Sequence, residues 1–298
     1  MPSAQTQPDL AALIVRAERV LQQLEAWLPP APPPIDWNNS IAFRWRKKIH
    51  GRDGSSGHLE GVRSVHKITL ADLHGIDRQK KVVEQNTRQF IAGAPANNVL
   101  MTGSRGTGKS SLVKALLHKY ARKGLRVVEV DKDDLIDLMD IVDLLGARPE
   151  KFIVFCDDLS FDAGEAGYKA LKVILDGTVA ATSSNVLIYA TSNRRHLLPE
   201  YFSENLETRH IGEEVHPGES VEEKISLSER FGLWVSFYPF SQEEYFAAVK
   251  SWLTHFGFGA DAFDRLREEA VQWSLSRGSR SGRIAWQFAR DQAGRRAV

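Results

Sequence analysis

The stretch MTGSRGTGKSSL, residues 101–112, decides the fold. A glycine, four further residues and then Gly-Lys-Ser give the spacing of a phosphate-binding loop. The loop glycines let backbone N–H groups turn inward, and a helix beginning at Lys109 directs its positive end at the phosphates. We expect Lys109 to contact the outer phosphates and the Ser110 hydroxyl to bind Mg²⁺. The predicted nucleotide contacts here are Gly103, Ser104, Arg105, Gly106, Thr107, Gly108, Lys109, Ser110 and Ser111.

The residues around this loop show the pattern of a layered α/β domain. An apolar run at 98–102 leads directly into the loop, and residues 109–122 follow with helical spacing. Short apolar runs then alternate with helical stretches, which is typical of a parallel sheet covered by helices. We therefore predict five parallel strands, at 98–102, 126–131, 152–157, 186–191 and 234–238.

Acidic and amide side chains follow two of these strands. FIVFCDDLSF, residues 152–161, ends an apolar strand in two acids: Asp157 is expected to bind the metal and Asp158 to orient the attacking water. LIYATSN, residues 187–193, ends in Asn193. Because ligands lie at the carboxyl ends of parallel strands, Asn193 should face the same crevice and hold that water.

The two ends of the chain are predicted to be helical. Apolar residues at three- and four-residue steps indicate an amphipathic helix over 10–28, which the proline run PPAPPP ends. Whether this helix packs on the main body or recruits a partner or another copy stays open. Only helical patterns follow the last strand, so a small all-helical lid is expected. The predicted divisions are 1–34 for the helix and linker, 35–71 for a lead-in segment, 72–240 for the core and 241–298 for the lid.

The lead-in segment is basic and then rich in glycine and serine. Two aromatic residues, Phe43 and Trp45, alternate with its cations. This pattern fits either a nucleic-acid contact, with rings that stack on bases, or a solvated surface with two anchored aromatics. The basic residues in 44–52 are Arg44, Arg46, Lys47, Lys48 and Arg52.

The amino-acid composition is typical of an ordinary globular protein. The 298 residues are 42% hydrophobic and 26% charged, with a formal net charge of +1, so overall charge favours neither nucleic acid nor a membrane. The single cysteine, Cys156, excludes a disulfide within the chain and favours a reducing compartment. With no signal-peptide pattern and no apolar run long enough to span a bilayer, we expect a cytoplasmic protein without a membrane partner.

Two weaker patterns predict no metal site of their own. Aspartates recur at every third residue of one predicted helix, and this pattern predicts a solvated acidic face. The histidines have no zinc-ligand spacing with the cysteine, so no zinc is expected. The residues are Asp134, Asp137, Asp140 and Asp143, and His66, His74, His196, His210 and His216.

The loop, the acidic strand end and the Asn193 strand, in this order, resemble the AAA+ division of the P-loop ATPases. The resemblance implies an α/β ATPase core followed by a helical lid, over residues 72–298. The phrases PANNVLMTGSRGTGKSSLVKA, FCDDLSF, VLIYATSNRRHL and SERFGLWVSF further resemble a bacterial AAA+ family known as domain of unknown function 815. That second resemblance covers roughly residues 41–298.

The AAA+ resemblance assigns further residues. LADLHGIDRQKK, residues 70–81, looks like the segment on the adenine, with His74, Gly75 and Ile76 nearest the base. Arg230 occupies the place of an arginine finger, which reaches the γ-phosphate on a neighbouring subunit. Arg283 occupies the place of the lid arginine that senses the nucleotide, with Arg280 as a rival. Arginine suits these roles because its planar donors bind two phosphate oxygens at once.

These assignments predict an oligomeric ATPase, as a ring or an open ring, that hydrolyses ATP with Mg²⁺ and remodels a protein client. The adjacent Asp157 and Asp158 leave a second function open, because initiator-type AAA+ proteins that act as slow switches on nucleic acid also carry Asp-Asp here. A nucleotide-binding assembly protein that hardly hydrolyses ATP is the third alternative. Lys109, Asp158, Asn193 and Arg230 are the expected catalytic residues; Ser110 and Asp157 are the expected metal ligands.

Overall fold

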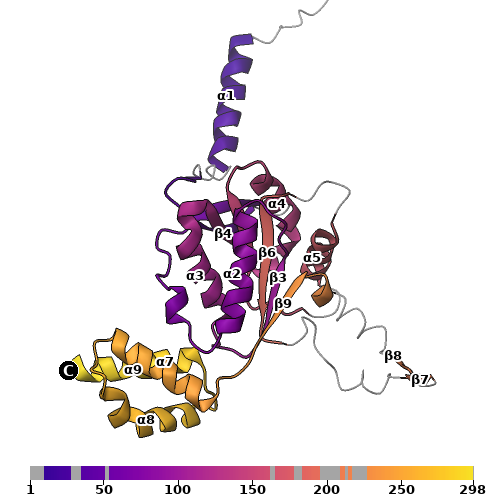
Figure 1. Cartoon of the computed structure of the whole chain (residues 1–298). Coiled ribbons are helices and arrows are strands. Elements are labelled where there is room, and N and C mark those ends of the chain that lie inside the picture. The colour runs from indigo at the N-terminus through magenta and orange to yellow at the C-terminus, as the bar shows by residue number, and fades with distance from the viewer. Residues whose placement is uncertain are drawn as a thin grey trace, which may run out of the picture.

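The structure, a computed structural model, describes residues 10–27, 35–50, 54–161, 165–177, 183–194, 209–211, 214–216 and 227–297. Its centre is a seven-stranded sheet with helices on both faces, and three further helices form a group at one end (Figure 1). The predicted α/β core with a helical lid is therefore confirmed. The predicted domain limits stay predictions.

The five predicted parallel strands are all present. They are β3 (Val99–Gly103), β4 (Leu125–Glu129), β5 (Lys151–Cys156), β6 (Val186–Ser192) and β9 (Leu233–Phe237). Their order in the sheet is β4-β5-β6-β3-β9, and every neighbouring pair is parallel. The ends of β3, β5 and β6 therefore meet at one edge, where the phosphate-binding loop lies.

The sheet contains two more strands than predicted, both from the lead-in segment. Strand β1 (Ala42–His50) pairs parallel to β4, and β2 (Gly54–Gly61) pairs antiparallel to β1. The side chains of Phe43 and Trp45 are buried while Arg44 is exposed between them, which is the two-residue period of a strand. The basic composition of this segment masked that alternation in the sequence.

Arg44, Arg46 and Lys47 of β1 lie close to acids of the same chain. Arg44 Nε lies 2.6 Å from Glu129 Oε2, and Lys47 Nζ lies 3.0 Å from Asp137 Oδ2. Arg46 lies 3.5 Å from Glu60. The two aromatic rings are buried below these residues, so the segment agrees with the interpretation of a solvated surface with two anchored aromatics. Arg52 lies outside the described residues.

The expected acidic face is only partly solvated. A 3-10 helix (Lys132–Asp137) precedes α4 (Leu138–Gly146), and its carboxylates face β1. Asp137 Oδ2 accepts a hydrogen bond of 2.9 Å from Trp45 Nε1, and burial raises the pKa of Asp134. The prediction of a fully solvated stripe was therefore wrong for these two aspartates, although Asp140 and Asp143 are exposed.

Two apolar layers hold the helices on the sheet. One layer contains α2 (Asp77–Ile91) and α3 (Lys109–Tyr120), and the other contains α4 and α5 (Ala166–Asp176). Side chains from each central strand alternate between the two layers, because successive residues of a strand point to opposite faces. The central strands are thus buried on both faces, which explains their almost continuous apolar sequence.

The remaining elements lie at the margins. The lid consists of α7 (Gln242–His255), α8 (Ala262–Ser276) and α9 (Gly282–Ala297), and a two-stranded ribbon pairs β7 (Arg209–Ile211) with β8 (Glu214–His216). Helix α1 (Leu10–Trp27) projects away from the core (Figure 1). The following apolar residues of α1 are 48% to 72% exposed: Leu10, Leu13, Ile14, Val15, Val20 and Leu21.

Candidate nucleotide-binding site

The phosphate-binding loop needs glycine where the chain turns tightly. Gly103 ends β3 at φ +124°, and a Cβ there would lie 1.8 Å from the carbonyl oxygen of Phe237 in β9. Gly108 precedes α3 at φ +105°, a left-handed conformation that residues with a side chain seldom adopt. These glycine conformations permit the tight turn of a phosphate-binding loop, called the glycine cradle below, in which backbone N–H groups can face a phosphate chain.

Lys109 lies at the centre of the site and is only 6% exposed. Its Nζ donates hydrogen bonds to the carbonyl oxygens of Gly103 and Ser104, at 2.7 and 2.8 Å, and to Asn193 Oδ1 at 3.1 Å. Burial lowers its pKa to about 8, since removal from water disfavours the ammonium, although Asp157 and Asp158 oppose this shift. An incoming polyphosphate would supply the negative charge that this buried cation lacks.

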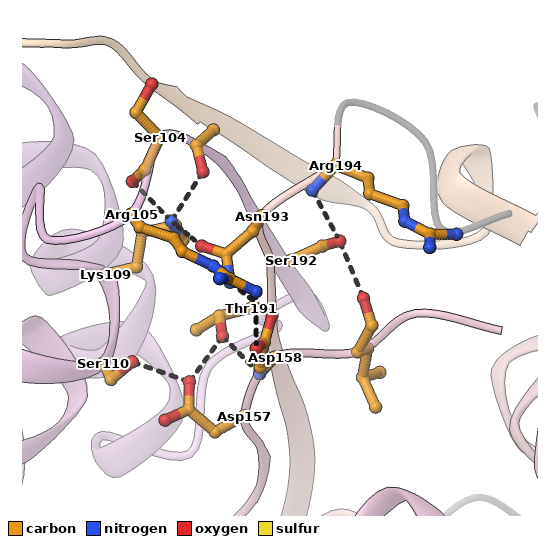
Figure 2. Close-up of polar contacts among 12 residues, drawn as sticks. Ser104, Arg105, Lys109, Ser110, Asp157, Asp158, Thr191, Ser192, Asn193 and Arg194 are labelled. Carbon is orange, nitrogen blue, oxygen red and sulfur yellow. Dashed lines mark hydrogen bonds and ion pairs between the residues drawn. The ribbon is translucent and has the colours of Figure 1, made fainter. Parts of the chain in front are cut away.

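The two acids after β5 have different partners (Figure 2). Asp157 Oδ1 accepts hydrogen bonds of 2.6 Å from both Ser110 Oγ and Thr191 Oγ1. Asp158 Oδ1 accepts a hydrogen bond from Asn193 Nδ2, and Arg105 lies 3.7 Å from Asp158 Oδ2. The ends of β5 and β6, the loop and the start of α3 are thereby linked side chain to side chain.

The paired Ser110 hydroxyl and Asp157 carboxylate fit Mg²⁺. Both are hard oxygen donors, and Mg²⁺ is commonly held by one or two protein oxygens together with substrate phosphates and waters. They lie beside the glycine cradle, where the phosphates of a nucleotide would be bound. Ser110 and Asp157 are therefore the residues that would hold the ion.

A cavity of about 620 Å³ extends from the loop to the lid. The predicted site residues that line it are His74, Ile76, Arg105, Gly106, Thr107, Gly108, Lys109, Ser110, Ser111, Asp157, Asp158, Asn193 and Arg283. Gly103 and Ser104 lie beneath it and hold Lys109, while Gly75, at φ +70°, packs against Phe240. One cavity thus collects nearly all the predicted nucleotide contacts.

His74, which lines the cavity, is predicted to lie beside the base. Its Nε2 is buried and has no hydrogen-bond partner in the described structure, and burial lowers the pKa of the imidazole. A neutral imidazole can accept a hydrogen bond, which is the interaction that the amino group of adenine offers. The residue therefore fits its predicted place beside the base.

The lid contacts the loop directly. The backbone N–H of Arg283 donates to the carbonyl oxygen of Gly106 at 3.1 Å. Arg283 lines the cavity, whereas Arg280 is not one of its lining residues and instead accepts a backbone hydrogen bond from Phe240. Of the two arginines, Arg283 is thus placed to respond to a bound nucleotide.

Arg230 lies apart from the other predicted catalytic residues. It is not a lining residue of the cavity, and its Nε donates to Asp176 Oδ1 at the end of α5. Within one chain, the structure therefore brings together Lys109, Asp158 and Asn193 but not Arg230.

Several lining residues carry no signal in the motifs. His66, Phe240, Trp252 and Trp286 come from the core margin and the lid, and their sequence context is ordinary. Thr191 also lines the cavity. It belongs to the phrase LIYATSN, and its position at the end of a predicted strand could have identified it as a candidate site residue.

The fold and the cavity define the class of protein. A parallel sheet ordered β4-β5-β6-β3-β9, a phosphate-binding loop after β3 and a helical lid together form the AAA+ fold. Within that class, the chain belongs to the family described as protein of unknown function (DUF815), whose model matches residues 38–296. No curated protein matches the chain.

Solved structures resemble the chain at low sequence identity. The AAA domain of FIGL-1, crystallised with ADP, has a TM-score of 0.50 and 18% identity over 77% of this chain and 74% of that chain. A mutant of Thermotoga maritima RuvB has a TM-score of 0.47 and 14% identity over 76% and 64%, so the present chain spans under two thirds of it. The E. coli MS115-1 HORMA:CdnC:Trip13 complex contains a chain with a TM-score of 0.42 and 13% identity over 74% and 90%.

The part of the chain that the structure describes contains no cluster of three or more His, Cys, Asp or Glu able to hold a metal. This finding does not extend to His196, which lies outside the described residues. None of the described helices has the length and apolar content needed to cross a lipid bilayer.

Proposed function

We propose that the protein binds ATP with Mg²⁺ and hydrolyses it to ADP and phosphate, working as an oligomer that remodels a protein client. The observation that carries the proposal is the continuous set of contacts from Lys109 through Asn193 to Asp158 at the edge of one cavity. These groups surround the place where the glycine cradle would put the terminal phosphates.

The reaction would join a water oxygen to the γ-phosphorus and break the bond to the ADP oxygen. Asn193 and Asp158 would orient the water, and the Asp158 carboxylate would accept its proton. Lys109 would offset the charge of the β- and γ-phosphates, and Mg²⁺, when bound, supplies further charge neutralisation. Positioning and electrostatics, rather than covalent chemistry, then lower the barrier.

A second copy of the chain would complete the site. Arg230 contacts Asp176 and does not line the cavity of its own chain, and an arginine that stabilises transferred phosphate is needed for fast turnover in many such enzymes. We therefore propose that Arg230 of one subunit contacts the γ-phosphate bound by its neighbour. A ring or an open ring would supply this contact at each interface.

The client of the reaction is proposed to be a protein. Helix α1 presents exposed apolar residues, which suit contact with a protein surface. Arg44 and Lys47 of β1 are paired with acids, which weakens the alternative of a nucleic-acid switch. We also propose a cytoplasmic location, because the single cysteine is free and buried.

The test is phosphate release from ATP by the wild-type protein and by Asp158→Asn, at several protein concentrations. We expect wild-type turnover per subunit to rise as the protein assembles, and the variant to bind ATP while releasing at least about 100-fold less phosphate. Unchanged phosphate release by Asp158→Asn would contradict the proposal. Capturing partners with the ATP-loaded variant would then identify the client.

A further inference from the structure

Thr191 holds the three residues that follow β5. It lies at the carboxyl end of β6 and is 1% exposed. Its hydroxyl donates to Asp157 Oδ1 at 2.6 Å and accepts from the backbone N–H of Asp158 at 2.9 Å (Figure 2). Its carbonyl oxygen accepts from the N–H of Leu159 at 2.7 Å. A single side chain therefore contacts both acids of the site.

The backbone of Asp158 needs such support. Its φ is +53°, which makes it the one residue other than glycine with a positive φ in the described part of the chain. A side chain makes this conformation unfavourable, and it persists where surrounding bonds hold it. The bonds from Thr191 to the N–H groups of Asp158 and Leu159 fix this turn on both sides, and they direct the Asp158 carboxylate towards Asn193.

The only proton of the Thr191 hydroxyl is committed by these contacts. A hydroxyl has one proton to donate, and this proton is directed to Asp157 while a lone pair accepts the Asp158 N–H. Ser110 donates to the same oxygen of Asp157, but its hydroxyl is also the expected ligand of Mg²⁺. Thr191 is thus the hydroxyl whose bond to Asp157 is separate from metal binding.

We propose that Thr191 is a positioning residue that aligns the metal-directed carboxylate of Asp157 and the water-directed carboxylate of Asp158 through one hydroxyl. The roles of the two acids in this inference rest on the proposed function. Thr191 acts through these two carboxylates, in the way that a residue hydrogen-bonded to a metal ligand orients that ligand and tunes the metal affinity.

The experiment compares Thr191→Val, which keeps the shape and removes the hydroxyl, with Thr191→Ser, which keeps the hydroxyl. Thr87→Val is the matched control, because Thr87 is equally buried and its hydroxyl bonds Val83 and Tyr189 away from the cavity. Mn²⁺ binding in the presence of ADP is measured by electron paramagnetic resonance, and ADP binding is measured separately in EDTA.

For Thr191→Val we expect Mn²⁺ affinity to fall about tenfold, with ADP affinity in EDTA within about twofold of wild type. Thr191→Ser should restore most of the Mn²⁺ affinity. Thr87→Val should lower the melting temperature and leave Mn²⁺ affinity unchanged. Where ATP is hydrolysed, kcat should fall for Thr191→Val while KM stays nearly constant.

Wild-type Mn²⁺ affinity in Thr191→Val would overturn the inference, and so would an equal loss in Thr191→Ser or in Thr87→Val. The Mn²⁺ measurement needs no hydrolysis, so it decides the role of Thr191 even if the wild-type protein releases no phosphate. Absence of phosphate release would instead overturn the proposed function.

Discussion

Charged groups lie in two regions of the core: at the ends of β3, β5 and β6, and in the segment before β9. The two sets of groups contact different partners. Lys109 contacts Asn193 across the cavity, and Asn193 contacts Asp158. Arg230 instead contacts Asp176 of α5, outside the cavity. The first set is joined within one chain, while the arginine is held apart from it.

This difference suggests that nucleotide binding and nucleotide hydrolysis depend on different residues. The glycine cradle, Lys109 and the lid contact through Arg283 are complete in one chain, so a single subunit should bind nucleotide. In the proposed mechanism, Arg230 of another copy stabilises the charge that develops on the γ-phosphate. We therefore expect binding to be insensitive to assembly and hydrolysis to depend on it.

Arg230→Ala should give the largest effect. We expect kcat to fall by about 10³ or more, because an arginine finger contributes that much where it acts. ATP affinity should stay within about threefold of wild type, as measured with a fluorescent nucleotide.

Asp176→Ala is the control for Arg230→Ala, because it removes the same ion pair and leaves the arginine. A partly exposed ion pair contributes little to stability, so this variant should keep most of the activity. Equal losses of kcat in the two variants would show that the pair, rather than an arginine finger, matters.

The lowered pKa of Lys109 predicts a pH dependence of binding. Below pH 8 the ammonium is charged both with and without nucleotide, so affinity should be flat. Above the pKa of about 8, binding must first restore the proton, and ADP affinity measured in EDTA should weaken by about tenfold per pH unit. Lys109→Arg should show no such fall, since the guanidinium stays charged.

The stability of the free protein should show the opposite trend. Because the folded pKa lies below the unfolded value of 10.5, the unfolded chain binds more protons between about pH 8 and 10.5. The contribution of Lys109 to the free energy of unfolding therefore increases with pH across that window. A wild-type ADP affinity that is constant from pH 7 to above the pKa of about 8 would contradict this account of the lysine.

Contact between the lid and the loop should give a smaller effect. A Cβ added at Gly106 would lie 2.7 Å from Ser281 Oγ and 3.0 Å from Arg283 Cβ. Gly93 has nearly the same φ, +76° against +77°, but a Cβ there has nothing within 4 Å. We expect both Gly→Ala variants to lose about 1 kcal/mol of stability from backbone strain, and only Gly106→Ala to weaken ADP binding, by about fivefold. Equal ADP affinity in the two variants would contradict a role for this contact.

The sequence predicted those parts of the site that follow local rules. The loop and the acids after β5 are contiguous motifs, and the topology of a parallel sheet brings Asn193 to the same edge. Thr191 was visible, but its role depends on the left-handed backbone of Asp158, which the residue types alone do not specify.

Contacts between residues far apart in the chain could not be predicted from the sequence. The bond between Arg230 and Asp176 joins segments far apart in the chain, and the same holds for Trp45 and Asp137. Strand β1 was missed for another reason: its alternation of buried and exposed residues was present, but five cations within 44–52 favoured a surface interpretation.

The central claim is that one chain holds the ATP and another supplies the arginine. Mixing Arg230→Ala with Asp158→Asn tests it, because a site can then combine the intact Asp158 of the first variant with the intact Arg230 of the second. For rings assembled at random from equal amounts of the two variants, about a quarter of the sites recover both residues, so phosphate release should return to about a quarter of the wild-type rate. A mixture no more active than the two variants measured separately would contradict the claim.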